Sequence, residues 1–151
     1  MVDIVDSVTR SRMMAGIKGR NTKPELLIRS ILHRRGFRFR LHVKDLPGKP
    51  DIVLPKYHAV IFIHGCFWHG HENCRLFKLP GTRLEFWQNK IYKNKENDSR
   101  TIELLLSNSW RVCIIWECRI RQEKKDLSQV ADIISDFIKG SAPFLELRDL
   151  N

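Results

Sequence analysis

Residues 64–74 read His-Gly-Cys-Phe-Trp-His-Gly-His-Glu-Asn-Cys and hold an unusual number of chemically capable side chains. This run contains three of the six histidines and two of the four cysteines of the 151-residue chain, and the aromatic pair Phe67-Trp68 stands in its middle. Thiols and imidazoles bind metals, an imidazole exchanges protons near neutral pH, and aromatic rings stack on flat ligands. The run therefore predicts a metal site, an acid–base group and a stacking surface close together.

A zinc site is the first prediction. Four potential ligands suit a tetrahedral site: Cys66, His71, Cys74 and Cys118. Three thiolates and one imidazole form a common structural zinc set, and a closed set leaves no position for a reactive water. His64 and His69 compete with Cys118 for the fourth position, whereas Cys113 is expected to be a buried apolar thiol. The alternative is that all these cysteines are reduced core residues.

A catalytic aspartate is the second prediction. Asp51 follows Pro50 at the start of a strand-like segment, and the next such segment ends in Phe62-Ile63-His64. A Pro-Asp pair before a second strand is typical of the nuclease fold of restriction enzymes, whose carboxylate binds Mg²⁺. The usual Glu-x-Lys of the second strand is missing here, and a Pro-Asp pair alone is also typical of a turn.

Phosphodiester hydrolysis also needs a base that deprotonates the attacking water. His69 and His64 both suit this role, because imidazole titrates near neutral pH. Glu25 either holds one of these histidines in orientation or belongs to an ordinary helix-capping box that starts at Thr22. The residues alone leave these choices open.

The elements that position these residues predict a layered α/β domain. We expect Gly36 to end the second helix, with Arg29, Arg34 and Arg35 facing solvent. A hairpin is expected around 55–57, a long functional loop over 64–82, and no clear pattern after 140. The expected helices are 6–19, 22–35, 84–106 and 126–139, and the expected strands are 37–43, 51–54, 58–63 and 110–116.

Charge is distributed unevenly along the chain. The net charge is +10, and residues 10–49 hold 12 lysines and arginines against only Glu25 and Asp45. A local basic excess indicates a polyphosphate partner, most often nucleic acid, although a merely soluble basic surface is the simpler alternative. No apolar run is long enough for a membrane span, and residues 1–9 lack the pattern of a secretory signal. We therefore expect a cytoplasmic protein.

Several longer motifs resemble the Vsr endonucleases, the very-short-patch mismatch repair enzymes of bacteria. The resemblance spans about residues 9–139. Its motifs are Thr9-Arg10-Ser11-Arg12-Met13-Met14, Leu46-Pro47-Gly48-Lys49-Pro50-Asp51, Ile61-Phe62-Ile63-His64-Gly65-Cys66-Phe67-Trp68-His69, Thr82-Arg83-Leu84-Glu85-Phe86-Trp87, Trp110-Arg111-Val112 and Trp116-Glu117-Cys118.

The resemblance implies a restriction-endonuclease-like α/β core, in which helices flank a mixed central β-sheet. It implies an Mg²⁺-dependent nick 5′ to the thymine of a T:G mismatch, the product of 5-methylcytosine deamination. Such a nick starts very-short-patch repair. The implied structural zinc ligands are Cys66, His71, Cys74 and Cys118.

The resemblance also assigns catalytic roles. Asp51 and the backbone carbonyl of Ile63 are the implied Mg²⁺ ligands, His69 is the base, His64 assists, and Glu25 is the supporting acid. Two features depart from the family pattern: Ile63 stands where threonine is frequent, and the segment 71–74 is one residue longer than usual.

The aromatic residues suit mismatch recognition, because weak stacking at a mismatch makes insertion of a flat side chain less costly. Phe67, Trp68 and Trp87 resemble a wedge that enters from the major groove, and Met14 resembles a probe of the minor groove. Further DNA contacts are expected from four basic residues: Arg10, Arg12, Lys90 and Lys93.

We expect three regions: a DNA-contacting arm (1–20), an endonuclease domain (21–140) and a C-terminal tail (141–151). The resemblance implies a monomer at the bacterial nucleoid, with mismatch-repair proteins and a DNA polymerase as partners. Two other functions compete with this one. They are a restriction-type nuclease that cuts intact duplex and a zinc-stabilised DNA-binding module without catalysis.

Overall fold

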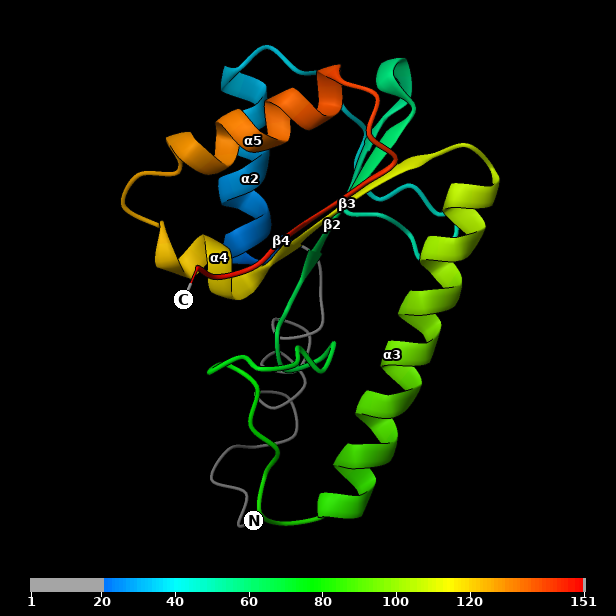
Figure 1. Ribbon diagram of the computed structural model, residues 1–151, viewed down its shortest axis with the longest axis vertical. Coiled ribbons are helices and arrows are strands. Elements are labelled where there is room, and N and C mark those ends of the chain that lie inside the picture. The colour runs from blue at the N-terminus through cyan, green and yellow to red at the C-terminus, as the bar shows by residue number, and fades with distance from the viewer. Residues whose placement is uncertain (1–20, 151) are drawn as a thin grey trace.

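A four-stranded mixed sheet forms the centre of this computed structural model, which describes residues 21–150 (Figure 1). The strands are β1 (Ile52–Leu54), β2 (Ala59–His64), β3 (Arg111–Trp116) and β4 (Phe144–Leu147), in the order β1-β2-β3-β4. β1 pairs antiparallel with β2, whereas β3 is parallel to both β2 and β4. The predicted helix 6–19 and the arm residues Arg10, Arg12 and Met14 lie outside the described residues.

Helices cover both faces of this sheet. α2 (Lys23–Arg34), α4 (Glu117–Gln122) and α5 (Ser128–Lys139) lie on one side, and the long α3 (Leu84–Ser107) lies on the other (Figure 1). The predicted fold class, a mixed sheet flanked by helices, is confirmed. No helix within residues 21–150 is both long and apolar enough to cross a membrane.

The alternation of side chains along each strand produces two apolar layers. Ile61 and Ile115 point into the layer formed with α2 and α5. Their neighbours Phe62 and Ile114 point into the opposite layer, which contains Leu105 of α3 and three of the cysteines. The second layer therefore joins the sheet to α3 and to the cysteine-rich loop.

The predicted hairpin is confirmed. β1 and β2 are joined by η1 (Pro55–Tyr57) and by His58, whose φ of 52° reverses the chain. Ile52 pairs with Ile61, and this register brings Asp51 beside the end of β2. The sequence of the turn thus positions the candidate catalytic carboxylate.

The predicted strand 37–43 is wrong. Only Arg40 bridges to the sheet, through two backbone hydrogen bonds with Val53. His42 has a φ of 59°, and a left-handed residue interrupts an extended ladder. Phe37 is nevertheless buried in the core, and Phe39 and Leu41 pack partly buried against it, which explains why the segment alternates like a strand.

The second predicted helix is confirmed as α2, and Gly36 follows it with a φ of 90°. Two details differ from expectation. Thr22 makes no side-chain capping bond, and instead Glu25 accepts hydrogen bonds from the Asn21 N–H and from Arg29. Arg29 does not face solvent, since its side chain is only 11% exposed.

Two elements have no counterpart among the expectations. α4 begins directly where β3 ends, and the segment after Gly140 supplies β4, which pairs with β3 from Val112 to Ile115. β4 consists of only four residues, of which two are exposed and one is buried, so it lacks the apolar run that identifies a buried strand. Residues 144–147 of the predicted C-terminal tail are therefore part of the sheet.

Candidate functional site

One cleft of about 920 Å³ is lined by all four predicted catalytic residues. It is lined by the start of α2, the turn 48–51, the end of β2, the loop after β2, one side of α3, and α4. Asp51, His64 and His69 all line this cleft, as do Phe67 and Trp68. The structure thus brings together the carboxylate, the histidines and part of the aromatic cluster.

Asp51 is held at the end of β2. Its Oδ2 accepts a hydrogen bond of 2.7 Å from the Ile63 N–H, which fixes the carboxylate beside the Ile63 peptide. Burial raises the pKa of Asp51 from 3.8 to about 6, a shift opposed by the Ile63 hydrogen bond and reinforced by the nearby Glu25. A carboxylate and a backbone carbonyl at one position are hard oxygen donors, the kind that Mg²⁺ prefers.

The two histidines lie face to face. Their ring centroids are 3.8 Å apart, and the planes differ by 3°. Burial, followed by the neighbouring His69 and His71, lowers the pKa of His64 well below its usual value. His64 is therefore neutral at physiological pH, and its buried Nδ1 has no hydrogen-bond partner among the described residues.

His69 has a carboxylate partner that sequence reasoning missed. Its Nδ1 lies 2.6 Å from Oδ2 of Asp98, a residue in the middle of α3. A carboxylate at Nδ1 fixes the ring and the tautomer, which leaves Nε2 available to accept a proton. Ligand atoms of His64, His69 and Asp98 lie within 4.8 Å of one another, so these three residues form one compact group.

Glu25 lines the same cleft, but its hydrogen bonds go to Asn21 and Arg29. It is near enough to Asp51 to raise the pKa of that carboxyl. Among the described carboxylates, the one bonded to His69 is Asp98 and not Glu25. Glu25 therefore influences Asp51 through its negative charge, which favours the protonated form of that carboxyl.

The signal for Asp98 was present in the helical spacing of α3. Five residues line the cleft from this helix, and each is three or four positions from another of them: Lys90, Asn94, Asp98, Thr101 and Ile102. Residues at this spacing share one face of a helix. Lys93 falls between them, is exposed, and does not line the cleft.

The aromatic residues form a cluster at the cleft. Phe67 contacts Trp68 and Trp87 at centroid distances of 5.1 and 5.4 Å, and the two tryptophans are 5.8 Å apart. All three are half-buried, so part of each ring is accessible. Asn94 Nδ2 donates to the Trp68 carbonyl at 2.8 Å, which ties the cluster to α3.

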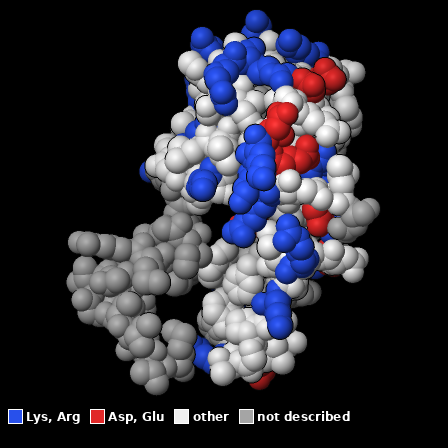
Figure 2. Space-filling view, turned by 90° about the vertical axis from the view of Figure 1, so that its left-hand side faces the viewer, with Lys and Arg blue, Asp and Glu red and all other residues white. Residues whose placement is uncertain are grey.

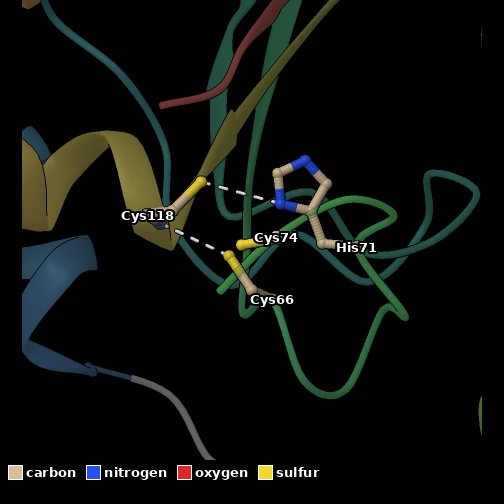
Figure 3. A group of neighbouring side chains, drawn as sticks. All are labelled: Cys66, His71, Cys74 and Cys118. Carbon is tan, nitrogen blue, oxygen red and sulfur yellow. Dashed lines mark hydrogen bonds between the residues drawn. The ribbon is translucent and has the colours of Figure 1, made fainter. Parts of the chain in front are cut away.

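The predicted zinc ligands come together beside the cleft. Ligand atoms of Cys66, His71, Cys74 and Cys118 lie within 4.8 Å of one another, and all four residues are buried. Figure 3 shows the three loop side chains converging on Cys118, which stands at the start of α4. This Cys₃His cluster is consistent with structural zinc.

The chemistry of the cluster fits this metal. Burial raises the pKa of the Cys66 and Cys118 thiols when no metal is bound, and a bound cation would displace their protons to give the thiolates that hold zinc. Burial, followed by the positive charge of Arg148, lowers the pKa of His71, which keeps the imidazole in the neutral form that binds metals. Cys113 is completely buried in β3, outside the cluster, as expected.

Basic side chains extend beyond the cleft. Figure 2 shows lysines and arginines following one another along one face, with carboxylates gathered between them in its upper half. Lys49, Lys90 and Arg121 line the cleft itself. A cleft that is lined by cations, a carboxylate and a histidine held by a second carboxylate contains the kinds of group that phosphodiester hydrolysis uses.

Comparisons with known proteins agree with this class. The family model described as "DNA mismatch endonuclease Vsr" matches residues 2–75. The DNA mismatch endonuclease Vsr of Escherichia coli (strain K12) is 49% identical over 125 residues, which cover 83% of this chain and 80% of the relative. The type II nicking enzyme V.XorIIP of Xanthomonas oryzae pv. oryzae is 47% identical over 120 residues, or 80% and 88% of the two chains.

A third relative, the type II nicking enzyme V.NmeAIP of Neisseria meningitidis, is 43% identical over 123 residues, covering 82% of this chain and 87% of its own. The chain belongs to the Vsr family of DNA mismatch endonucleases. It is thus a DNA endonuclease, a phosphodiester hydrolase, as predicted.

Proposed function

We propose that this enzyme nicks one DNA strand 5′ to the thymine of a T:G mismatch and so starts very-short-patch repair. The observation that carries this proposal is the cleft in which Asp51 and the His69–Asp98 pair lie beside the Phe67–Trp68–Trp87 cluster. Hydrolytic groups and a stacking surface occupy one site. The names of the relatives, a mismatch endonuclease and nicking enzymes, support the same reading.

Asp51 and the Ile63 carbonyl are the proposed Mg²⁺ ligands. A bound Mg²⁺ supplies stabilisation of the negative charge that develops on the scissile phosphate. Only the backbone of Ile63 takes part, so isoleucine serves as well as threonine at this position. The ionised form of Asp51 is required, and it predominates above pH 6.

His69 is the proposed base. Because Asp98 holds Nδ1, Nε2 takes the proton of the attacking water. His64 packs on the face of His69 and stays neutral, so it does not oppose the positive charge that His69 acquires. Glu25 completes the site by holding Arg29 and by adjusting Asp51.

Phe67, Trp68 and Trp87 are proposed to insert at the mismatch, where weak stacking lowers the cost of unstacking the bases. Lys90 lies at the same cleft and is proposed to contact the DNA there, and Lys93 is proposed to contact it outside the cleft. Met14, Arg10 and Arg12 are proposed contacts from the segment 1–20. Mismatch-repair proteins and a DNA polymerase are the proposed partners of a monomeric enzyme at the nucleoid.

The test is an assay of nicks per strand with Mg²⁺ on matched and T:G duplexes of the same sequence. We expect nicking of the thymine strand alone, and only in the T:G duplex. Cutting of both strands of matched DNA would indicate a restriction-type nuclease instead. Binding without nicking would indicate a DNA-binding module.

A further inference from the structure

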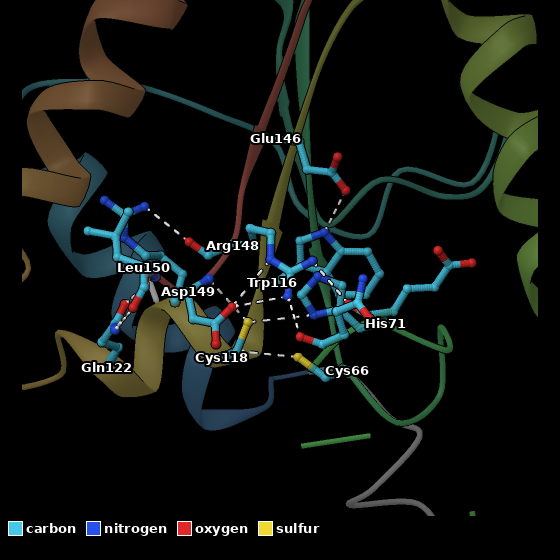
Figure 4. A network of polar contacts seen from close by, with 12 residues as sticks. Cys66, His71, Trp116, Cys118, Gln122, Glu146, Arg148, Asp149 and Leu150 are labelled. Carbon is cyan, nitrogen blue, oxygen red and sulfur yellow. Dashed lines mark hydrogen bonds and ion pairs between the residues drawn. The ribbon is translucent and has the colours of Figure 1, made fainter. Parts of the chain in front are cut away.

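The end of β4 lies against the Cys₃His cluster (Figure 4). Arg148 Nη1 donates to the Glu72 carbonyl at 3.0 Å, and Nη2 donates to the Asn73 carbonyl at 2.9 Å. These two carbonyls belong to the short segment between the ligands His71 and Cys74. The Arg148 guanidinium therefore holds, by two hydrogen bonds, the part of the loop that lies between these two ligands.

Arg148 is itself held in place. Its guanidinium bonds to Oδ1 of Asp149, a residue only 8% exposed, and its carbonyl accepts a hydrogen bond from Arg119 of α4. The Asp149 N–H lies 3.4 Å from Sγ of Cys118. The segment 148–149 is thus bonded both to the loop and to Cys118, another ligand of the cluster.

A second connection runs through Trp116. Glu146 accepts a hydrogen bond of 2.7 Å from Trp116 Nε1, and the indole ring stacks on the imidazole of His71 at 3.8 Å with the planes 4° apart. The end of β4 thereby orients His71 as well. The end of β4 and the residues after it therefore contact the neighbourhood of the cluster at three points, through Glu146, Arg148 and Asp149.

We propose that Arg148 is a positioning residue that secures the zinc loop, and through it the catalytic loop. This inference rests on the zinc assignment made above. His69 and the Phe67-Trp68 pair lie between Cys66 and His71, so the ligands fix both ends of the segment that carries the base and part of the wedge. Groups that orient metal ligands commonly change metal affinity by about 10- to 100-fold when they are removed.

The experiment compares the full-length parent with Arg148→Gln, Arg148→Lys and the control Arg34→Gln. Arg34 is exposed on α2, and its Nε donates a hydrogen bond to the Ser30 carbonyl of the same helix. Zinc content is measured first by metal analysis, and zinc release to a chromogenic chelator is then followed in time. Nicking of T:G DNA is measured with and without added zinc.

We expect Arg148→Gln to release zinc about tenfold faster or more, and added zinc to restore part of its nicking. Arg148→Lys should release zinc at an intermediate rate, because an ammonium cannot bond two carbonyls in the fixed fork of a guanidinium. Arg34→Gln should match the parent. Rescue by zinc separates a positioning role from general destabilisation.

Parental release rates in Arg148→Gln would overturn the proposal. If Arg148→Gln does not fold, parental release in Arg148→Lys would overturn it equally. A parent that contains no zinc would instead overturn the zinc assignment itself, so the two failures are distinguishable.

Discussion

Asp51 is a carboxylate that the fold holds in an unfavourable environment. Its pKa is about 6 in the folded protein and 3.8 in the unfolded chain. The folded state therefore binds the proton more tightly, and the stability of the protein falls as pH rises between these values. At about 1.4 kcal/mol per pKa unit, ionised Asp51 costs the metal-free protein up to about 3 kcal/mol at pH 7.

We predict that Asp51→Asn abolishes nicking but raises the thermal midpoint at pH 7.5 without metal. The gain should shrink as pH falls from 6 toward 4, and saturating Mg²⁺ should reduce it by stabilising the parent. Calorimetry across this pH range measures the effect, with the exposed Asp136→Asn as control. A variant less stable than the parent at pH 7.5 would contradict the assigned burial cost.

Asp98 and Glu25 offer a matched comparison at the residue scale. Because Asp98 bonds His69, Asp98→Asn should lower kcat for nicking by about 10- to 100-fold with little change in KM. Glu25→Gln should lower kcat less, since its bonds go to Asn21 and Arg29. Steady-state nicking of T:G DNA measures both, and a larger loss in Glu25→Gln would refute the role of Asp98.

At the scale of elements, α3 packs closely against the turn before Asp51 at Gly48, which has no side chain to obstruct the contact. A Cβ at Gly48 would lie 2.3 Å from Cγ2 of Thr101, so any side chain there pushes the turn before Asp51 away from α3. Gly36 provides a control with a similarly positive φ and open space around its Cα. Both substitutions strain the backbone, but only one disturbs the cleft.

We predict that Gly48→Ala destabilises the protein by about 1–3 kcal/mol more than Gly36→Ala and also lowers nicking. Thr101→Ser removes the clashing methyl and should restore part of both losses. Chemical denaturation and the nicking assay test this. Equal effects of the two glycine variants would show that α3 docking does not depend on this contact.

The aromatic cluster also belongs to this scale, because its members come from a loop and a helix. Trp68→Ala should reduce the preference for T:G over matched duplex by about 1–3 kcal/mol, the scale of base–aromatic stacking. Competition binding with both duplexes measures the preference. The exposed Tyr92→Ala, on α3 outside the cluster, is the control; equal discrimination by both variants would assign Trp68 to packing alone.

Sequence patterns identified these elements unequally. α2, α5, β2 and β3 were predictable because each has an apolar pattern with the period of its element and clear end signals. β4 was not predictable, since a strand of four residues with only one buried side chain carries no such pattern. The prediction for 37–43 was wrong because Phe37, Phe39 and Leu41 pack alternately against the core without forming a strand.

The candidate site shows the same division. The cysteine and histidine ligands were found because they lie close together in sequence, with Cys118 at a strand end. Asp98 was not found, because its contact with His69 joins residues 29 positions apart and depends on how α3 lies against the loop. Arg148 lies farther still, 75 and 76 positions from the carbonyls that it binds.

At the scale of the whole molecule, the Cys₃His cluster joins the loop after β2 to the start of α4 and the end of β4. Removal of zinc should therefore lower the thermal midpoint and abolish both nicking and mismatch preference. Cys66→Ala should do the same, whereas Cys113→Ala, equally buried but outside the cluster, should keep its zinc. Metal analysis with thermal melting tests this, and full zinc content in Cys66→Ala would contradict the site.

α3 sets a fixed distance between two parts of the candidate site. Trp87 of the stacking cluster and Asp98 beside the base are eleven residues apart on this helix, about three turns and roughly 16 Å. A helix does not stretch, so the proposed stacking cluster and the proposed base keep a constant separation. One residue inserted between them would rotate Asp98 by about 100° around the helix axis, away from His69. We expect such a variant to keep its preference for the mismatch but to lose nicking.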